Sequence, residues 1–375
     1  MSKKKKILFI TDQQEYSENG TISTLFDQYL QEYFDVHIVY ITKYKHSFQE
    51  KGRHYIVPID KKDNIVEYLE AKGIDMSLFS VVFVRNKKEV LKNVLENKKR
   101  FAYKVAYRVS YPKRYHKLHQ LNTGSPIGFI KSMVHKKRIV KRDALANQCD
   151  LFLPPSVQVQ ERFFPNIRVE SFPVFTGLAP DELNEHRITD DKIRKFIFVG
   201  LLDEMREFHT VLDAFDSLKN ENWHLTISTT NKDYINQLVK KYPNLITKIS
   251  IVSAMSLKEL REQINEHDVG IATLPKNDFY DTVLADKVLD YYTCSIPVLL
   301  TSNVMNHSVF TDDEAIFSDF ESSKIANKLD ELINTSNEEL SIIGNNGQKK
   351  LLRLERNYKI LAEHLAEKLE EVIEK

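Results

Sequence analysis

Two charged residues in the second half of the chain, Lys287 and Asp290, precede a short apolar run at 296–300 that is typical of a buried strand. A carboxylate late in a helix, just before a tight turn into a strand, lies at the rim of a crevice and can accept hydrogen bonds from a ribose diol. A helix N-terminus one or two turns away can hold a phosphate, because its amides and dipole favour negative charge. The spacing therefore predicts a nucleotide-sugar site. The alternative is an exposed helix aspartate beside Lys287.

Backbone groups near this helix are further candidates for binding the nucleotide-sugar. The amides of Thr282 and Val283 would open the helix and meet a diphosphate; the alternative is an ordinary helix start capped by Asp281. Val252 and Ser253 end an earlier apolar segment, and strand ends that face a crevice are the usual ligand sites of open α/β sheets. We therefore expect these four residues to line the donor site.

Arg206 is the candidate for clamping a diphosphate. Its planar guanidinium suits phosphate oxygens and can stabilise charge that develops on a leaving group. Lys287 is a second basic candidate. The alternative for Arg206 is a solvated loop position paired with Glu204 or Glu207.

In the first half, Asp12 and His116 could act as a general base toward an acceptor hydroxyl. Asp12 ends the first expected strand, and His116 follows the strand expected at 104–110. A histidine in such a Lys/Arg-rich loop can equally be a plain surface residue. Tyr111 and Tyr115 lie in the same loop, where their rings would be free to stack on a sugar or lipid acceptor.

The composition indicates a globular protein of two domains. The chain has 375 residues, of which 29% are charged and 42% hydrophobic, and this is more than one ordinary core accommodates. No apolar run approaches the roughly 20 residues that cross a bilayer, and the start is not a signal-peptide pattern. Two distant cysteines indicate neither a disulfide framework nor a metal site, so a reducing cytosol is the expected setting.

The net charge of +1 hides an asymmetry between the halves. Residues 1–175 carry 31 Lys+Arg against 18 Asp+Glu, whereas residues 176–375 carry 23 against 35. The basic half would suit anionic headgroups or a lipid-diphosphate acceptor. A basic helix segment within it is either a membrane-surface patch or a solvated face, and its members are Lys136, Lys137, Arg138, Lys141 and Arg142. Nucleic acid is not expected as a partner, since no nucleic-acid-binding pattern is present.

Strand and helix patterns alternate through both halves, which predicts two tandem doubly wound, Rossmann-like α/β domains. Strands are expected at 5–11, 36–42, 55–58, 80–85, 104–110 and 151–153, and again at 195–199, 224–228, 249–252, 269–273 and 296–300. Helices are expected at 21–32, 65–72, 87–97 and 126–147, then at 208–218, 234–241, 256–266, from 282 to 294, and at 357–375. We assign an acceptor domain at 1–178, a linker at 179–193, a nucleotide-sugar domain at 194–356 and a C-terminal helix at 357–375 that packs across the domains.

Four passages, in order, resemble the group 1 (family 4) glycosyltransferases of the GT-B fold. They are FVGLLDEMR at 198–206 with the helix after it, WHLTI at 223–227, the stretch from IV at 251–252 through SLKEL at 256–260 to HDV at 267–269, and DKVLDY at 286–291 with IPV at 296–298. The segment DALANQCDLFLPPS at 143–156 is similar to the helix and strand that close the first domain of that family. The resemblance implies base contacts from the strand end at Val252, retention of anomeric configuration, no cofactor and no bound metal.

Several positions depart from the family pattern. Thr282 stands where a second acidic residue is expected, with seven residues between it and Asp290, which itself replaces the usual glutamate. Leu201 stands in place of the expected arginine, and the turn at 293–295 has no glycine. We predict a cytoplasmic hexosyltransferase, peripheral at the inner face of the membrane. It would move a sugar from a UDP- or GDP-linked donor to a cell-envelope polysaccharide or lipid-linked glycan. A non-catalytic GT-B partner subunit and a nucleotide-sugar epimerase are the alternatives.

Overall fold

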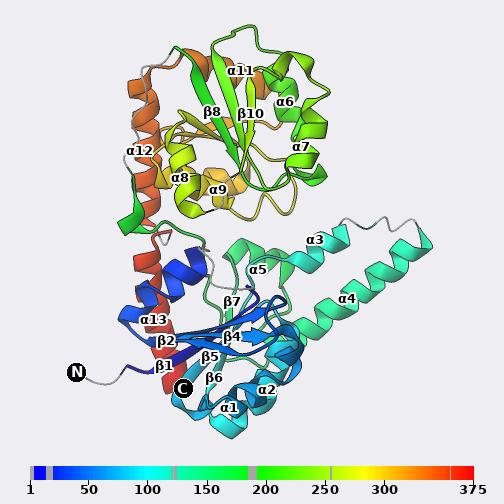
Figure 1. Cartoon of the computed structure of the whole chain (residues 1–375), viewed down its shortest axis with the longest axis vertical. Helices are drawn as coiled ribbons and strands as arrows, with labels where there is room; N and C mark the ends of the chain where they lie inside the picture. Colours follow the sequence, from blue (N-terminus) through cyan, green and yellow to red (C-terminus); the bar gives the residue numbers. More distant parts are fainter. Residues whose placement is uncertain are drawn as a thin grey trace. The chain divides into compact units, whose positions relative to one another are not determined.

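The computed structural model describes residues 4–13, 20–119, 121, 125–184, 192–253, 256–354 and 356–375. The chain forms two compact units (Figure 1). Unit 1 comprises Met1–Thr176 together with Tyr358–Lys375, and unit 2 comprises Gly177–Asn357. The C-terminal helix therefore groups with the first unit. Part of the linker assigned to 179–193 lies outside the described residues.

Unit 1 is built on a sheet with the strand order β3-β4-β2-β1-β5-β6-β7. Neighbouring strands are parallel, except that β3 runs antiparallel to β4. The strands are β1 (Lys6–Thr11), β2 (Asp35–Thr42), β3 (Gln49–Lys51), β4 (His54–Pro58), β5 (Phe79–Arg85), β6 (Lys104–Arg108) and β7 (Leu151–Leu153).

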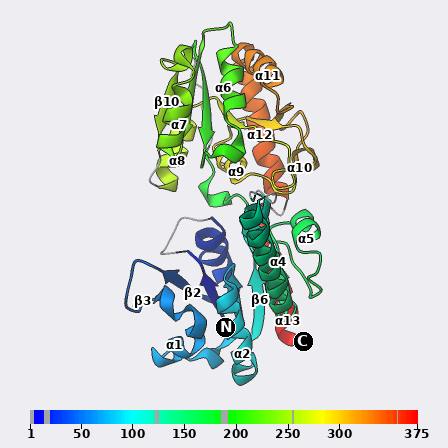
Figure 2. The same ribbon diagram turned by 90° about the vertical axis from the view of Figure 1, so that its right-hand side faces the viewer.

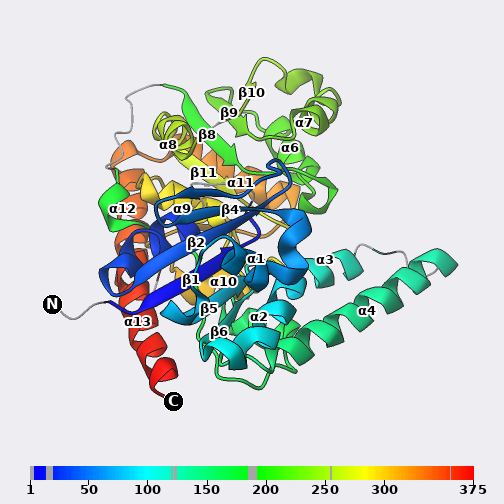
Figure 3. The same cartoon turned by 60° about the horizontal axis from the view of Figure 1, so that its bottom comes forward.

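Helices cover both faces of this sheet (Figures 1 and 2). The short helices η1 (Thr21–Phe26) and η2 (Tyr29–Glu32) pack with α13 (Tyr358–Glu374), while α1 (Ile65–Ala71) and α2 (Lys88–Phe101) pack with each other. The remaining helices are α3 (Lys113–His119), α4 (Pro126–Ala146) and α5 (Val157–Phe163). Figures 1 and 3 show α4 running outward from the sheet of unit 1, and α3 packs against it.

Unit 2 has a parallel sheet with the order β10-β9-β8-β11-β12-β13. Alternate side chains of β8 enter two separate cores, because successive strand residues face opposite sides. Phe196 and Phe198 pack with α6, α7 and α11, whereas Ile197 and Val199 pack with α9 and α10. The elements are β8 (Arg194–Val199), α6 (His209–Asp216), β9 (Trp223–Ser228), α7 (Lys232–Val239), β10 (Ile249–Val252), α8 (Leu257–Asn265), β11 (Val269–Ala272), α9 (Asp286–Thr293), β12 (Val298–Thr301), α10 (Val304–Val309), β13 (Ile316–Ser318), α11 (Ser322–Asn334) and α12 (Asn337–Arg353).

The predicted fold class, two doubly wound α/β domains with a C-terminal helix, is confirmed. One predicted helix is wrong. Residues 21–32 form a π-turn and a separate 3-10 turn in place of a continuous α-helix. Core packing holds the segment in this shape. The Phe26 ring stacks on the Phe9 ring, with 4.1 Å between the centroids, and contacts the Phe83 ring edge to face. The loop expected around His116 is helical, as α3.

Candidate functional site

Helix α9 is fixed against the carboxyl end of the unit 2 sheet by Tyr291. The Tyr291 hydroxyl accepts a hydrogen bond from the Val199 amide at 2.9 Å and lies 3.1 Å from the carbonyl oxygens of Ile197 and Ile271. Gly270 on β11 makes room for the ring, because a Cβ there would lie 2.5 Å from ring carbons of Tyr291. These contacts orient the preceding residue, Asp290, and Lys287 one helical turn before it.

The turn after α9 is equally constrained. Ser295 has φ +55°, a left-handed conformation that favours glycine. Helix α12 packs directly on this turn. A Cβ added to Gly344 would lie 2.0 Å from the Ser295 carbonyl oxygen. The turn therefore keeps its shape without glycine because its surroundings are close-packed.

The Lys287 ammonium is buried and has no hydrogen-bond partner among the described residues. It lies 3.5 Å from the centroid of the Phe198 ring, and its neighbourhood includes Gly200 at the end of β8. Burial lowers the pKa of Lys287 well below its usual value, and the nearby charge of Arg206 lowers it further. A desolvated cation of this kind favours a bound anion, because the charges of Asp290 and Asp286 act on it without forming an ion pair or hydrogen bond with it.

Arg206 lies close enough to Lys287 to act on its charge. Its Nη1 is 2.6 Å from the Asp203 carboxylate, so its ion-pair partner is Asp203 and neither of the glutamates considered from the sequence. The side chain is partly exposed, which leaves donors of the guanidinium available. Arg206 and Lys287 thus form a pair of cations at the carboxyl end of β8.

Asp290 is partly buried on α9, and no described residue donates a hydrogen bond to it. Burial and the like charge of Asp286 raise its pKa to about 7, although Arg261 and Lys287 oppose this. Because no described residue donates to the Asp290 carboxyl group, its oxygens are available to accept hydrogen bonds from a diol ligand.

The raised pKa of Asp290 makes a testable contribution to stability. Because the folded-state pKa exceeds the unfolded one, the stabilising effect of the proton is full below about pH 4 and is lost as the pH rises through 7. We therefore expect Asp290→Asn to raise the free energy of unfolding relative to wild type by roughly 1–3 kcal/mol at pH 8 and much less at pH 4, allowing for partial exposure. Urea denaturation at both pH values measures this. The exposed Asp233→Asn is the control, and an equal effect of Asp290→Asn at both pH values would refute the assignment.

The predicted helix start at Thr282 is wrong. Helix α9 begins at Asp286 after Ala285, and Asp281 does not cap it. The Thr282 hydroxyl instead bonds back to the Asp278 and Phe279 carbonyls, at 3.1 and 3.2 Å, which holds the segment in a turn. The first-turn amides of α9, which were expected to meet a diphosphate, therefore begin four residues later than predicted.

Val252 and Ser253 lie at the carboxyl end of β10, as the strand pattern predicted. The Ser253 carbonyl oxygen is 3.4 Å from the Gln263 amide nitrogen, and Gln263 also accepts from Ser228 at 2.8 Å. Strands β8, β9 and β10 are adjacent and parallel, so their carboxyl ends share one edge of the sheet.

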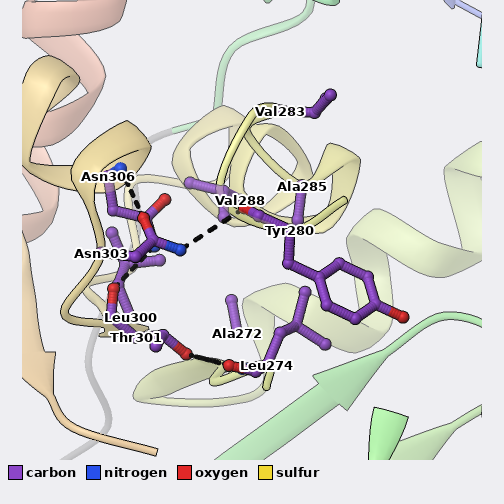
Figure 4. Close-up of a pocket in the computed structure, with 10 residues that line it drawn as sticks. All are labelled: Ala272, Leu274, Tyr280, Val283, Ala285, Val288, Leu300, Thr301, Asn303 and Asn306. Carbon is purple, nitrogen blue, oxygen red and sulfur yellow. Dashed lines mark hydrogen bonds between the residues drawn. The ribbon is translucent and has the colours of Figure 1, made fainter. Parts of the chain in front are cut away.

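A small pocket at the same sheet edge brings in residues that the sequence reasoning missed (Figure 4). Val283 lines it, together with Tyr280, Asn303 and Asn306. Asn303 donates to the Tyr280 carbonyl at 3.4 Å and caps α10 by accepting from the Asn306 amide. Arg206 is also among the charges that act on the Tyr280 hydroxyl. The available signal was position, because Asn303 lies two residues after the end of β12.

In unit 1, Asp12 follows β1 but is already paired. Its carboxylate accepts from Arg85 at 2.7 Å and from Asn86 at 3.0 Å, and Lys113 lies 3.7 Å away. His116 lies in α3, but its side chain is outside the described part of the structure. The structure therefore brings Asp12 together with cations, and its role as a base stays a prediction.

Tyr115 and Arg142 are packed inside unit 1. The Tyr115 ring lies 5.3 Å from that of Phe163 and is not free as expected, while Tyr111 remains only half-buried. Arg142 is buried, bonds Asp143 at 2.5 Å and lies over the Phe164 ring. Its assignment to a surface patch is wrong, because it falls on the inward face of α4 with Ser132.

Comparisons with known proteins agree with this fold. Residues 181–350 match the family model described as Glycosyl transferases group 1. The matched residues all lie in the second unit. Sucrose-phosphate synthase from Thermosynechococcus elongatus superposes with a TM-score of 0.73 at 12% identity, covering 98% of this chain and 99% of that one. HepE of Anabaena, in complex with UDP and glucose, gives 0.69 at 13% identity with the same coverages.

A glycosyltransferase from Rickettsia africae gives a TM-score of 0.67 at 10% identity and covers 100% of this chain and 99% of that one. A comparison with curated protein sequences finds no match. The GT-B fold and the predicted group 1 resemblance are thus confirmed, and the chain is a glycosyltransferase.

Two further properties concern the described residues alone. They contain no cluster of three or more His, Cys, Asp or Glu side chains suited to a metal ion. No helix among them has the length and apolar character needed to span a bilayer.

Proposed function

We propose that this glycosyltransferase moves a sugar from a UDP- or GDP-linked donor, held by unit 2, to a cell-envelope polysaccharide or lipid-linked glycan, with retention of configuration. The observation that carries the donor half is the buried, unpartnered ammonium of Lys287 beside Arg206. Two cations at a sheet edge suit a diphosphate, and they stabilise the charge that develops on the nucleotide as it leaves. In this proposal the two cations neutralise the charge on the leaving diphosphate, as a bound metal ion does in other transferases.

The nucleoside would lie along the same edge. Asp290 would accept hydrogen bonds from the ribose hydroxyls, and backbone groups at Val252 and Ser253 would contact the base. HepE, which shares the fold, was solved with UDP and glucose, and this favours uracil over guanine. The sugar would lie outside the pocket at Tyr280 and Asn303, which is too small to enclose a hexose, and its hydroxyls would meet the polar groups at the pocket rim.

The acceptor half of the proposal rests on unit 1. Residues 1–175, which form most of unit 1, carry 31 Lys+Arg against 18 Asp+Glu, and this excess of positive charge suits a phosphate-linked or acidic acceptor. His116 or Asp12 would receive the acceptor proton, and Tyr111 would stack on the acceptor. Asp12 would first have to leave its pairing with Arg85.

Mass spectrometry of products from a panel of UDP- and GDP-sugars, with and without extracted lipid acceptors, tests the proposal. A glycosylated acceptor plus free nucleoside diphosphate is the expected result. An isomerised sugar nucleotide formed without acceptor would identify an epimerase instead. Absence of turnover together with absence of nucleotide binding would leave the partner-subunit alternative.

A further inference from the structure

Helix α4 exposes an apolar surface at its N-terminal end. Five large side chains in its first three turns are between 42% and 67% exposed, and we call them the apolar tip: Ile127, Phe129, Ile130, Met133 and Val134. The helix is anchored by its other face, where Gly128, Ser132 and Ile139 are buried. Clustered exposed apolar side chains of this kind mark an interaction surface.

Exposed cations follow the apolar tip along the helix. Lys136, Lys137, Arg138 and Lys141, the basic collar, are exposed, and none of them pairs with a carboxylate in the described part of the chain. Met133 and Lys137 are one turn apart, about 6 Å along the axis. Figures 1 and 3 show the N-terminal end of α4 pointing away from the sheet of unit 1. The apolar tip lies at this end, and the basic collar follows about one turn behind it.

Helix α3 adds to the positive charge. The pKa of His135, on α4, is lowered by burial and then by Arg114, Arg138 and Lys117, so cations from both helices surround it. A second copy of this chain pairing through the same face would bring collar against collar and suffer like-charge repulsion. The phosphates of a nucleic acid would bind the cations but would leave the side chains of the apolar tip exposed to water.

We propose that the apolar tip and basic collar dock this chain on an anionic lipid bilayer. The apolar side chains would enter the boundary between headgroups and acyl chains, to a depth of about 5–10 Å, and the collar would lie at the level of the lipid phosphates. This docking goes beyond sugar transfer and does not depend on which donor unit 2 binds.

Sedimentation of the full chain with vesicles tests the docking. We expect binding to phosphatidylcholine mixed with phosphatidylglycerol, and little to phosphatidylcholine alone. The triple variant Ile127→Ser, Ile130→Ser, Met133→Ser and the double variant Lys136→Glu, Lys137→Glu should each lower binding roughly tenfold or more. Matched controls in unit 1 are Tyr44→Ser with Leu78→Ser, and Lys51→Glu with Lys99→Glu, which replace exposed residues outside α4.

Insertion depth is read separately, because charge alone could hold the chain on a vesicle. In a Trp223→Phe background, a Phe129→Trp reporter should shift its emission to the blue on anionic vesicles and be quenched by brominated acyl chains. Vesicle binding without quenching would overturn the proposal. It would also be overturned by unchanged vesicle binding of both α4 variants, or by light scattering that shows the apolar variant turning a dimer into a monomer.

Discussion

Replacing Lys287 with methionine is expected to lower kcat/KM for sugar transfer by roughly 100- to 1,000-fold. Methionine keeps an unbranched apolar side chain of nearly the same length but removes the ammonium that lies over Phe198 and faces the proposed diphosphate. The loss should appear mainly in kcat, because charge on the leaving phosphate grows in the transition state. Initial rates with the donor identified in the product screen measure it.

The matched control for this variant is Lys240→Met, which removes an exposed lysine of unit 2. We expect near wild-type rates for the control and unchanged thermal stability for both variants, or a gain for Lys287→Met because an unpaired buried charge disappears. Wild-type kcat/KM in Lys287→Met would show that the buried cation is structural and does not contact the donor.

Gly344→Ala is expected to destabilise unit 2 by about 3 kcal/mol, the upper end of the usual cost of overpacking, because the added methyl meets backbone atoms. The added methyl would overlap the Ser295 carbonyl oxygen and press on the backbone before β12. For a domain of this size the melting temperature should fall by about 6–12 °C. Scanning calorimetry measures the shift.

Asn345→Ala, one residue further along α12, is the control because Asn345 is exposed and alanine favours helix. It should leave the melting temperature unchanged or raise it slightly. An equally stable Gly344→Ala would mean that α12 does not press on the turn after α9.

The strand pattern of the sequence predicted the sheets closely, because central parallel strands are continuous apolar runs. Residues 151–153 and 249–252 were predicted as strands with the bounds that the structure has. Helix α9 was placed four residues early. Its start depends on the Thr282 hydroxyl bonds and on the burial of Phe279, which are not visible in residue spacing.

Site residues were predictable where strand ends place them and unpredictable where tertiary contacts decide. Lys287 and Arg206 were proposed from charge alone, but the burial of Lys287 on Phe198 joins residues far apart in sequence. For Arg142 the sequence-based prediction of an exposed residue was wrong. It sits among surface cations in the sequence, yet its helical phase turns it inward to Asp143.

Calorimetric titration of UDP and UMP into the wild-type chain and Lys287→Met tests the central claim most directly. If the two cations hold the diphosphate, wild type should bind UDP at least about tenfold more tightly than UMP, and Lys287→Met should lose most of that preference. GDP and GMP provide the same comparison if guanine is the base. Equal affinity of wild type for the diphosphate and the monophosphate, or binding of neither, would contradict the account.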